Sequence, residues 1–369
     1  MIYPRDDCVG VISYPSDPLQ ALNCEGASAA LHGDERPTGD GASRTRGFEV
    51  RTTTKPGTHN DSIALLGSTI ISMSIRAVTF AALAALALSA WAQQGTLDKI
   101  KTSGVITIGH PIAIPFAYIA DGQHVGFAID LCARVVDAIK AELNLPVLKV
   151  VYLPTSPSDR IPQLVAGTID MECSSATNNA ERQRQVAYTM THFLAVNRFL
   201  ARKTDNLTTL EDLKGKTVVS RANTPNLKQI TELNTARNLG INILPVSNLN
   251  EGLPMVESGR AAAFVQDDIM LAAQAANHAN PGQWQISTEA LSAPEPYGIM
   301  LRRDDPAFKK VVDAAMVATY KSGEATKLYA KWFQSPIPPK GINLNMPPSA
   351  MMTNLFANPS DSPDPAAYK

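Results

Sequence analysis

The stretch GTIDMECSSATNNAERQ, residues 167–183, joins a strand pattern to a helix start through a polar turn. Ile169–Cys173 alternates apolar and acidic side chains, which is the period of a β-strand with one buried face. The polar turn Ser175–Asn179 follows, and Arg182 then lies in about the first turn of a helix. Backbone N–H groups at a helix start attract anions, and a guanidinium binds a carboxylate through two parallel hydrogen bonds. The stretch is therefore a candidate site for an anionic group, although these residues alone fit a solvated helix face equally well.

Short β-rich runs alternate with helical patterns on both sides of this stretch. Asp130–Leu143 places apolar residues at four-residue steps, and Asp305–Tyr320 repeats the pattern with Pro306 in its first turn. Gly323–Phe333 predicts a further short helix. The other strand candidates are Val105–Gly109, Lys149–Leu153, Thr217–Ser220, Ile243–Val246, Ala261–Val265 and Ile299–Leu301. Alternation of strands and helices predicts α/β sheets.

The 369-residue chain has the composition of an ordinary globular protein, with 44% hydrophobic and 18% charged residues. This excludes collagen, a disulfide scaffold or disorder of the whole chain, and the length predicts two or three domains. Lys plus Arg (33) balances Asp plus Glu (34), so no nucleic-acid partner is expected. The four cysteines form no C-x-x-C pair and the histidines are scattered, so no metal site is expected. Glycine-rich phosphate and dinucleotide motifs are absent from the sequence, so we expect no cofactor.

Residues 73–92 have the three parts of a secretory signal peptide. Arg76 gives a positive start, Ala77–Leu88 is almost wholly apolar, and Ala90 and Ala92 form a small-x-small cleavage site. We therefore expect cleavage after Ala92 and export of the remainder.

Residues 1–72 are rich in Gly, Thr, Arg, Asp and Pro and show no sustained period. We interpret them as upstream sequence translated in error, with Met73 as the true start. A real, disordered extension is one alternative. A membrane anchor is another, because Ile63–Trp91 contains a single charge and is long enough to span a bilayer.

Cys132 and Cys173 are the two cysteines that follow the cleavage site. Export would place them in an oxidising compartment, where a disulfide between them is possible. Two buried free thiols are at least as good an interpretation, and the sequence does not decide between them.

Two stretches of the chain resemble patterns of a known family. Gly126–Leu131, followed by Val135, Val136 and Ile139, resembles the signature of family 3 solute-binding proteins, with Ala128 where an acidic residue is usual. Residues 167–183 are similar to the glutamate/aspartate-binding subgroup, which serves amino-acid ABC importers. Further matches are Leu213–Lys216, Glu257–Arg260 with Asp267 and Asp268, Tyr297–Asp305 and Trp332–Lys340.

The resemblance implies an α/β fold of the periplasmic-binding-protein type II-like class. Two α/β lobes are joined by two crossover strands, and the ligand cleft lies between the lobes. Lobe 1 would comprise residues 96–192 plus 297–345, and lobe 2 would comprise 193–296. Residues 346–369 are interpreted as a C-terminal strap and disordered tail, because the segment is rich in proline and then polar.

The same resemblance assigns the α-carboxylate of an amino acid to Arg182, with Ser175 and Thr177 as donors. An amino acid carries charge at both ends, and burying either charge unpaired costs several kcal/mol. The alternative interpretation is that Glu181, Arg182 and Arg184 form a solvated helix face.

Asp267 would pair with the α-ammonium, because it follows the strand Ala261–Val265 at the end where α/β sheets bind ligands. Asp268 is the competing candidate, and an N-cap role is the alternative for either. Thr224 stands where the family's loop contacts the carboxylate. Pro225 beside it has no N–H to donate, so a plain turn is an equal interpretation of Thr224.

The residues that would recognise the ligand's side chain depart most from the subgroup. Pro111 stands where dicarboxylate binders have an arginine, Leu249 where they have a histidine, and Pro157 where they have a serine. Each lost charge-assisted hydrogen bond costs about 1.5–3 kcal/mol. Glutamate should then be a poor ligand unless a remaining guanidinium compensates, the candidates being the retained Arg160, Arg198 and Arg221. We therefore predict a small amino acid or carboxylate with a partly apolar side chain.

Together these features predict the periplasmic substrate-binding component of an amino-acid ABC transporter. It would be a monomer that binds a free amino acid, delivers it to a membrane permease and catalyses no reaction. A same-fold, dehydratase-like periplasmic enzyme is the alternative, with Glu172 as candidate acid or base, although its place in the strand alternation argues against this. A ligand sensor with the same pocket is a further alternative.

Overall fold

The computed structural model describes residues 95–368. The predicted signal peptide at 73–92, the extension 1–72 and the alternative membrane anchor lie outside the described residues. Within 95–368, no helix combines the length and the apolar character that crossing a bilayer requires.

The larger of the two main sheets combines parallel strands from the N-terminal part with one long strand from the C-terminal part. Its order is β4-β1-β5-β13-β6, and β7 also pairs with β13. β1, β4 and β5 are parallel, whereas β13 runs antiparallel to β5 and β6. The strands are β1 (Val105–His110), β4 (Lys149–Pro154), β5 (Met171–Thr177), β6 (Val186–Tyr188), β7 (Phe193–Ala195) and β13 (Glu295–Arg302). We call this sheet and the elements packed on it lobe 1.

The second sheet repeats this scheme with the strand order β10-β9-β11-β8-β12. β9, β10 and β11 are parallel, and β8 runs antiparallel to β11. The strands are β8 (Asn197–Arg202), β9 (Thr217–Arg221), β10 (Asn242–Val246), β11 (Ala263–Asp267) and β12 (Trp284–Ile286). We call this sheet and its helices lobe 2. The predicted α/β class is confirmed in both lobes.

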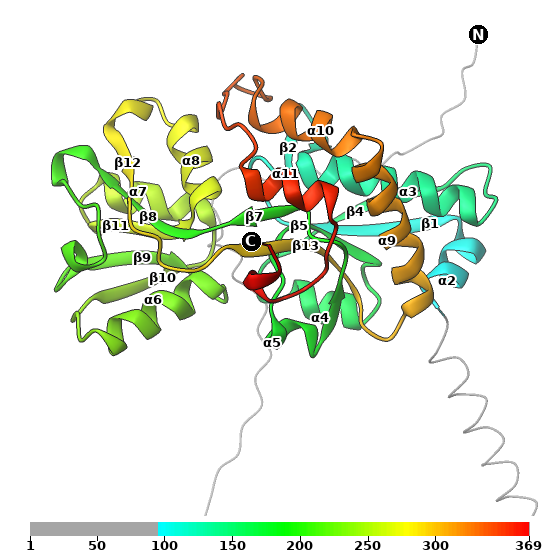
Figure 1. Cartoon of the computed structure of the whole chain (residues 1–369), viewed down its shortest axis with the longest axis horizontal. Helices are drawn as coiled ribbons and strands as arrows, with labels where there is room; N and C mark the ends of the chain where they lie inside the picture. Colours follow the sequence, from blue (N-terminus) through cyan, green and yellow to red (C-terminus); the bar gives the residue numbers. More distant parts are fainter. Residues whose placement is uncertain (1–94, 369) are drawn as a thin grey trace, which may run out of the picture. The chain divides into compact units, whose positions relative to one another are not determined.

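The chain crosses between the lobes twice, and the two crossings lie side by side (Figure 1). The first runs from β7 through Val196 into β8, and the second leads into β13. β7 pairs with the start of β13, so that Ala195 faces Glu295 and Phe193 faces Tyr297. The sheet of lobe 1 therefore extends to Ala195 and resumes at Glu295, a few residues beyond the predicted boundaries at 192 and 297. Backbone pairing between the crossings accounts for the difference.

Helices cover both sheets. In lobe 2, α6 (Pro225–Ala236) lies on one face of the sheet, and α7 (Gly252–Glu257) and α8 (Asp268–Asn277) lie on the other (Figure 1). Lobe 1 carries α2 (Thr96–Ser103), α3 (Phe127–Glu142), α4 (Arg160–Val165), α5 (Ala180–Gln183), α9 (Pro306–Lys321), α10 (Glu324–Phe333) and the hairpin of β2 (Tyr118–Ala120) and β3 (Gln123–Val125). Short 3₁₀ turns lie at Lys203–Asp205, Glu211–Leu213, Leu249–Glu251, Pro281–Gln283 and Pro365–Tyr368.

Gly126 fixes the start of α3, the helix of the Gly126–Leu131 pattern. Its φ is +135°, and a Cβ at this position would lie 2.2 Å from the carbonyl oxygen of Phe116. Only glycine fits such a close approach of two backbones. The apolar stripe of α3 is then buried against lobe 1, as Leu131, Val135 and Ile139 show by their complete burial.

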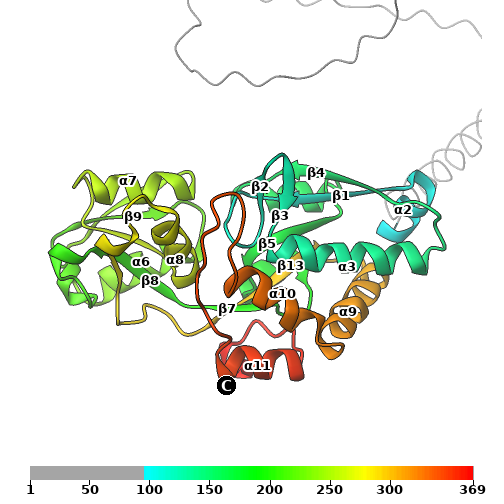
Figure 2. The same ribbon diagram turned by 90° about the horizontal axis from the view of Figure 1, so that it is seen from above.

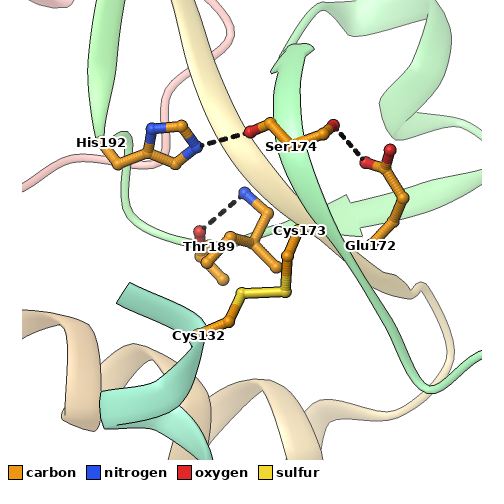
Figure 3. The surroundings of a disulfide bond; sticks show 7 residues. Cys132, Glu172, Cys173, Ser174, Thr189 and His192 are labelled. Atoms are coloured by element: carbon orange, nitrogen blue, oxygen red, sulfur yellow. Dashed lines mark hydrogen bonds between the residues drawn. A yellow bond between two sulfur atoms is a disulfide. The ribbon is translucent and has the colours of Figure 1, made fainter. Parts of the chain in front are cut away.

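A disulfide joins Cys132 on α3 to Cys173 on β5 (Figure 3). The pairing, which the sequence left open, ties the helix to the central strand that also carries Glu172 and Ser174. Sequence alone does not give the distance between the two Cα atoms, and the fold brings them to 6.4 Å.

Removing this disulfide is expected to lower the free energy of unfolding by about 4 kcal/mol, because the bond closes a loop with a sequence separation of 41 residues. Urea unfolding of the oxidised protein and of Cys132→Ala/Cys173→Ala, with free thiols counted, measures the loss. Identical midpoints for the two proteins would show that the bond contributes no stability.

The C-terminal segment is folded, which corrects the predicted disordered tail. Residues Ala350–Ala357 form α11, and Met352, Leu355 and Phe356 are buried. Both views place α11 beside β7 (Figures 1 and 2). Beyond it, the Tyr368 hydroxyl shares a hydrogen bond of 2.8 Å with that of Thr191. Apolar residues at helical spacing in α11 bury enough surface to order a segment that is otherwise polar and rich in proline.

Candidate functional site

A cavity lies where the parallel strands of both sheets end. The free space among its wall atoms is about 400 Å³, which includes space open to solvent. Its walls come from both lobes and comprise Pro111, Pro157, Arg160, Ser175, Thr177, Arg182, Arg221, Thr224, Pro225, Asn226, Leu249, Gln266, Asp267 and Met270. All six sequence-predicted site residues, Arg160, Ser175, Thr177, Arg182, Thr224 and Asp267, are among them.

Strand direction explains why these residues meet. Ligands bind at the carboxyl ends of parallel strands in α/β sheets. In lobe 1, Pro111 follows β1, Arg160 follows β4, and Thr177 ends β5. In lobe 2, Arg221 ends β9 and Leu249 follows β10, while β11 ends at Asp267. All six parallel strands therefore contribute to one cavity.

Arg182 is held in the wall by its own turn. The Asn179 side chain caps α5 by accepting a hydrogen bond of 2.9 Å from the Arg182 backbone N–H. The Arg182 guanidinium donates through Nη1 to the carbonyl oxygen of Thr177, also at 2.9 Å. Burial first, and the neighbouring charge of Arg160 second, lower the pKa of the guanidinium from its usual value. Glu181 and Arg184 are exposed, so the solvated helix face contains them but not Arg182.

Arg160, which lines the cavity, forms a buried pair with Glu172. Arg160 Nη1 lies 3.7 Å from Glu172 Oε1, and both side chains are buried. The Glu172 carboxylate also accepts a hydrogen bond of 2.7 Å from the Ser174 hydroxyl (Figure 3). The Arg160 Nε has no hydrogen-bond partner among the described residues. Glu172 is thus occupied by Arg160 and Ser174 and is absent from the cavity wall.

Asp267 is a buried carboxyl with two neutral partners. Its Oδ1 accepts a hydrogen bond of 2.8 Å from Asn226, and its Oδ2 accepts one from the Tyr297 hydroxyl. Burial, followed by the charge of Glu295, raises the pKa of Asp267 to about 7. Asp268 instead accepts hydrogen bonds from the backbone N–H groups of Val196 and Ile269 and does not line the cavity.

Thr224 has the turn role and also lines the cavity. It caps α6 by accepting a hydrogen bond from the Leu227 N–H at 3.4 Å, and Pro225 occupies the first position of the helix. Its hydroxyl donates to the carbonyl oxygen of Arg221 at 2.6 Å, and the residue also lines the cavity.

Sequence reasoning missed three polar residues around Asp267. Asn226 and Tyr297 of β13 donate hydrogen bonds to the Asp267 carboxylate. Glu295, on the second crossing, raises the pKa of Asp267 by its negative charge. Glu295 accepts from Gln229, and its second oxygen has no partner among the described residues. The one available signal was position, because Glu295 and Tyr297 lie where the predicted crossover borders the cleft.

Comparison with known proteins agrees with this architecture. The family model of bacterial extracellular solute-binding proteins, family 3, matches residues 106–335. An L-glutamate/L-aspartate-binding protein of Pseudomonas aeruginosa is 46% identical over 270 residues, which are 72% of this chain and 89% of the relative. A glutamate/aspartate import solute-binding protein of Escherichia coli is 40% identical over 291 residues, 76% of this chain and 96% of the relative.

A solved structure of an amino-acid-binding protein has the same fold. The crystal structure of the ancestral amino acid-binding protein AncCDT-1, a precursor of cyclohexadienyl dehydratase, superposes with a TM-score of 0.56 at 27% identity, covering 65% of this chain and 100% of that one. Its fold is the one implied by the sequence resemblance. The chain belongs to the bacterial extracellular solute-binding proteins, family 3.

Proposed function

We propose that this protein is the amino-acid-binding component of an ABC importer, and that it holds its ligand between the two lobes by the charges of the ligand's backbone. The observation that carries the proposal is that one cavity is lined by Arg182 from lobe 1 and by Asp267 from lobe 2. A free amino acid has an anion and a cation two bonds apart on the same carbon. The names of the Pseudomonas and Escherichia relatives support this class of ligand.

Arg182 binds the α-carboxylate in this proposal. Its Nη1 is already oriented by the Thr177 carbonyl, which leaves the other guanidinium N–H groups for two parallel bonds to a carboxylate. Ser175 and Thr177 line the cavity on the same strand, β5, and their hydroxyls supply further donors. Such preorganisation lowers the entropic cost of binding, because these groups are already ordered before the ligand arrives.

Asp267 binds the α-ammonium. Asn226 and Tyr297 hold the carboxylate in place by donating to it, and neither supplies a positive charge. The ligand's ammonium would provide that charge. Because Arg182 and Asp267 belong to different lobes, the complete grip exists only when the lobes are closed around the ligand, so binding shifts the population towards the closed state.

The location and partners follow from the same proposal. Residues 73–92 direct export to the periplasm and are removed after Ala92, and the Cys132–Cys173 disulfide suits an oxidising compartment. The exported chain acts as a monomer and passes its ligand to a membrane permease. Intact-mass analysis of the secreted protein tests the cleavage, since a mass that includes residues before Gln93 would contradict it.

Isothermal titration calorimetry with each of the twenty amino acids tests the function. We expect at least one to bind with micromolar or tighter affinity, about 8 kcal/mol of binding free energy. Lack of binding to every one of them would contradict the proposal.

In this proposal the protein binds its amino acid without converting it to a product. The relatives named above are binding proteins, and the candidate acid or base Glu172 is buried against Arg160 and Ser174. The bound amino acid, recovered after long incubation and analysed by mass spectrometry, should be unaltered. A converted product would favour the enzyme alternative.

A further inference from the structure

Three guanidinium groups line the cavity, and the backbone of an amino acid accounts for one of them. Arg160, Arg182 and Arg221 are the lining arginines, whereas Asp267 is the lining carboxylate. An amino acid brings its carboxylate to Arg182 and its ammonium to Asp267. Glu172 is the partner of Arg160. Arg221 is then left without an anion.

The contacts of Arg221 agree with the lack of an anionic partner. It forms no ion pair within residues 95–368, and the one side-chain hydrogen bond found for it runs from its Nε to the Ser247 carbonyl at 3.5 Å. Burial, and then the charge of Arg160, lower the pKa of Arg221 to about 10. Two neighbouring cations in a partly buried cavity repel each other, and an anion between them would relieve the repulsion.

Part of the remaining wall is apolar. Pro111, Pro157, Pro225, Leu249 and Met270 have side chains without a hydrogen-bond donor. A carboxylate needs donors, which the two guanidiniums supply. An amide brings no negative charge, so it would leave Arg221 without an anion.

Resting on the proposed function, we propose that Arg221 makes this protein selective for amino acids with a negatively charged side chain, by binding that charge from lobe 2 opposite Arg160 of lobe 1. The sequence predicted a partly apolar ligand side chain unless Arg160, Arg198 or Arg221 compensated. The structure places Arg160 and Arg221 in the cavity, while the Arg198 guanidinium donates to the carbonyls of Ser287 and Thr288.

The position of Arg221 on lobe 2 gives this charge a role in closure. Arg160 and Arg182 both belong to lobe 1, so an acidic amino acid bound there presents its side-chain carboxylate to the other lobe. Closing then brings Arg221 to an anion. With a neutral amino acid, closing brings Arg221 towards Arg160 alone. The selectivity is therefore expressed in the closing step as well as in affinity.

Calorimetry with L-glutamate, L-aspartate, L-glutamine and L-asparagine tests the role of Arg221. The wild-type protein should prefer the acid of each pair over the amide. Arg221→Gln should weaken binding of the preferred acid about 10- to 100-fold and change binding of the amides less than about threefold. Arg221→Lys keeps the charge and should retain most of the preference. Arg198→Gln, on the same lobe but outside the cavity, should behave as wild type.

Two outcomes would overturn this inference: a wild-type protein that binds amides as tightly as acids, and an Arg221→Gln variant with an unchanged acid-to-amide ratio. In both, an amino acid is still bound, so the proposed function stands. If the wild-type protein binds no amino acid at all, that result contradicts the proposed function itself, and the inference on Arg221 falls with it. A thermal melt of each variant confirms that it is folded, and Arg221→Met, which also removes the charge, takes the place of Arg221→Gln if that variant does not fold. Small-angle scattering with saturating glutamate should show less compaction for Arg221→Gln than for wild type.

Discussion

Replacing Arg182 by alanine is expected to weaken binding of the cognate amino acid by about 2–5 kcal/mol, at least roughly 30-fold. The guanidinium is the lining cation that the Asn179 cap and the Thr177 carbonyl hold beside Ser175 and Thr177. Its loss removes the guanidinium to which the α-carboxylate is assigned, while Arg160 and Arg221 remain elsewhere in the wall. Calorimetry on the purified variant measures the effect.

Arg184→Ala is the matched control, because Arg184 lies one residue beyond α5, is exposed and does not line the cavity. It should bind the ligand as the wild-type protein does. Equal affinities for Arg182→Ala and Arg184→Ala would mean that the α-carboxylate is bound elsewhere.

Asp267→Asn is expected to cost about 3 kcal/mol of binding free energy, roughly 150-fold in Kd. Asparagine preserves the shape of the side chain but removes the negative charge that pairs with the ammonium. Asp268→Asn is the control, since its side-chain oxygen can still accept from the Val196 and Ile269 N–H groups outside the cavity. Comparable losses from the two variants would contradict the assignment of the ammonium to Asp267.

Asp267 also makes the affinity depend on pH. Its pKa is raised to about 7 by burial and by the charge of Glu295, so the empty cavity takes up a proton below that pH. The ammonium requires the ionised form, and binding therefore releases the proton. The affinity for the amino acid should reach its maximum above pH 7 and should fall by up to about tenfold for each pH unit below it. Titration calorimetry between pH 5 and 8 measures this, and Asp267→Asn should give a much flatter profile.

Much of the fold could be predicted because each sheet reads as short apolar runs between helices. The run Val105–Gly109 became β1 at Val105–His110, and Asp305–Tyr320 became α9 at Pro306–Lys321. Predictions failed where long-range contacts decide the local state. The α11 helix is ordered by packing on lobe 1, and its polar surroundings conceal this.

The candidate site was partly predictable, because the family resemblance marked Arg182 and the strand ends of an α/β fold face one cleft. Arg182 and Asp267 follow recognisable strands and lie in the cavity together. The partners of Asp267 were hidden, since Tyr297 and Asn226 are 30 and 41 residues away in sequence. Arg221 was ambiguous because only the structure shows that it lines the cavity and Arg198 does not.

A crystal structure of the protein grown with saturating L-glutamate would show in one measurement which residues bind each charge of the ligand. We expect the α-carboxylate within hydrogen-bonding distance of the Arg182 guanidinium, and the ammonium against Asp267 on the opposite lobe. The side-chain carboxylate should lie between Arg160 and Arg221. A glutamate whose ammonium has no contact with Asp267, or whose α-carboxylate lies on Arg221 with Arg182 unengaged, would contradict this assignment.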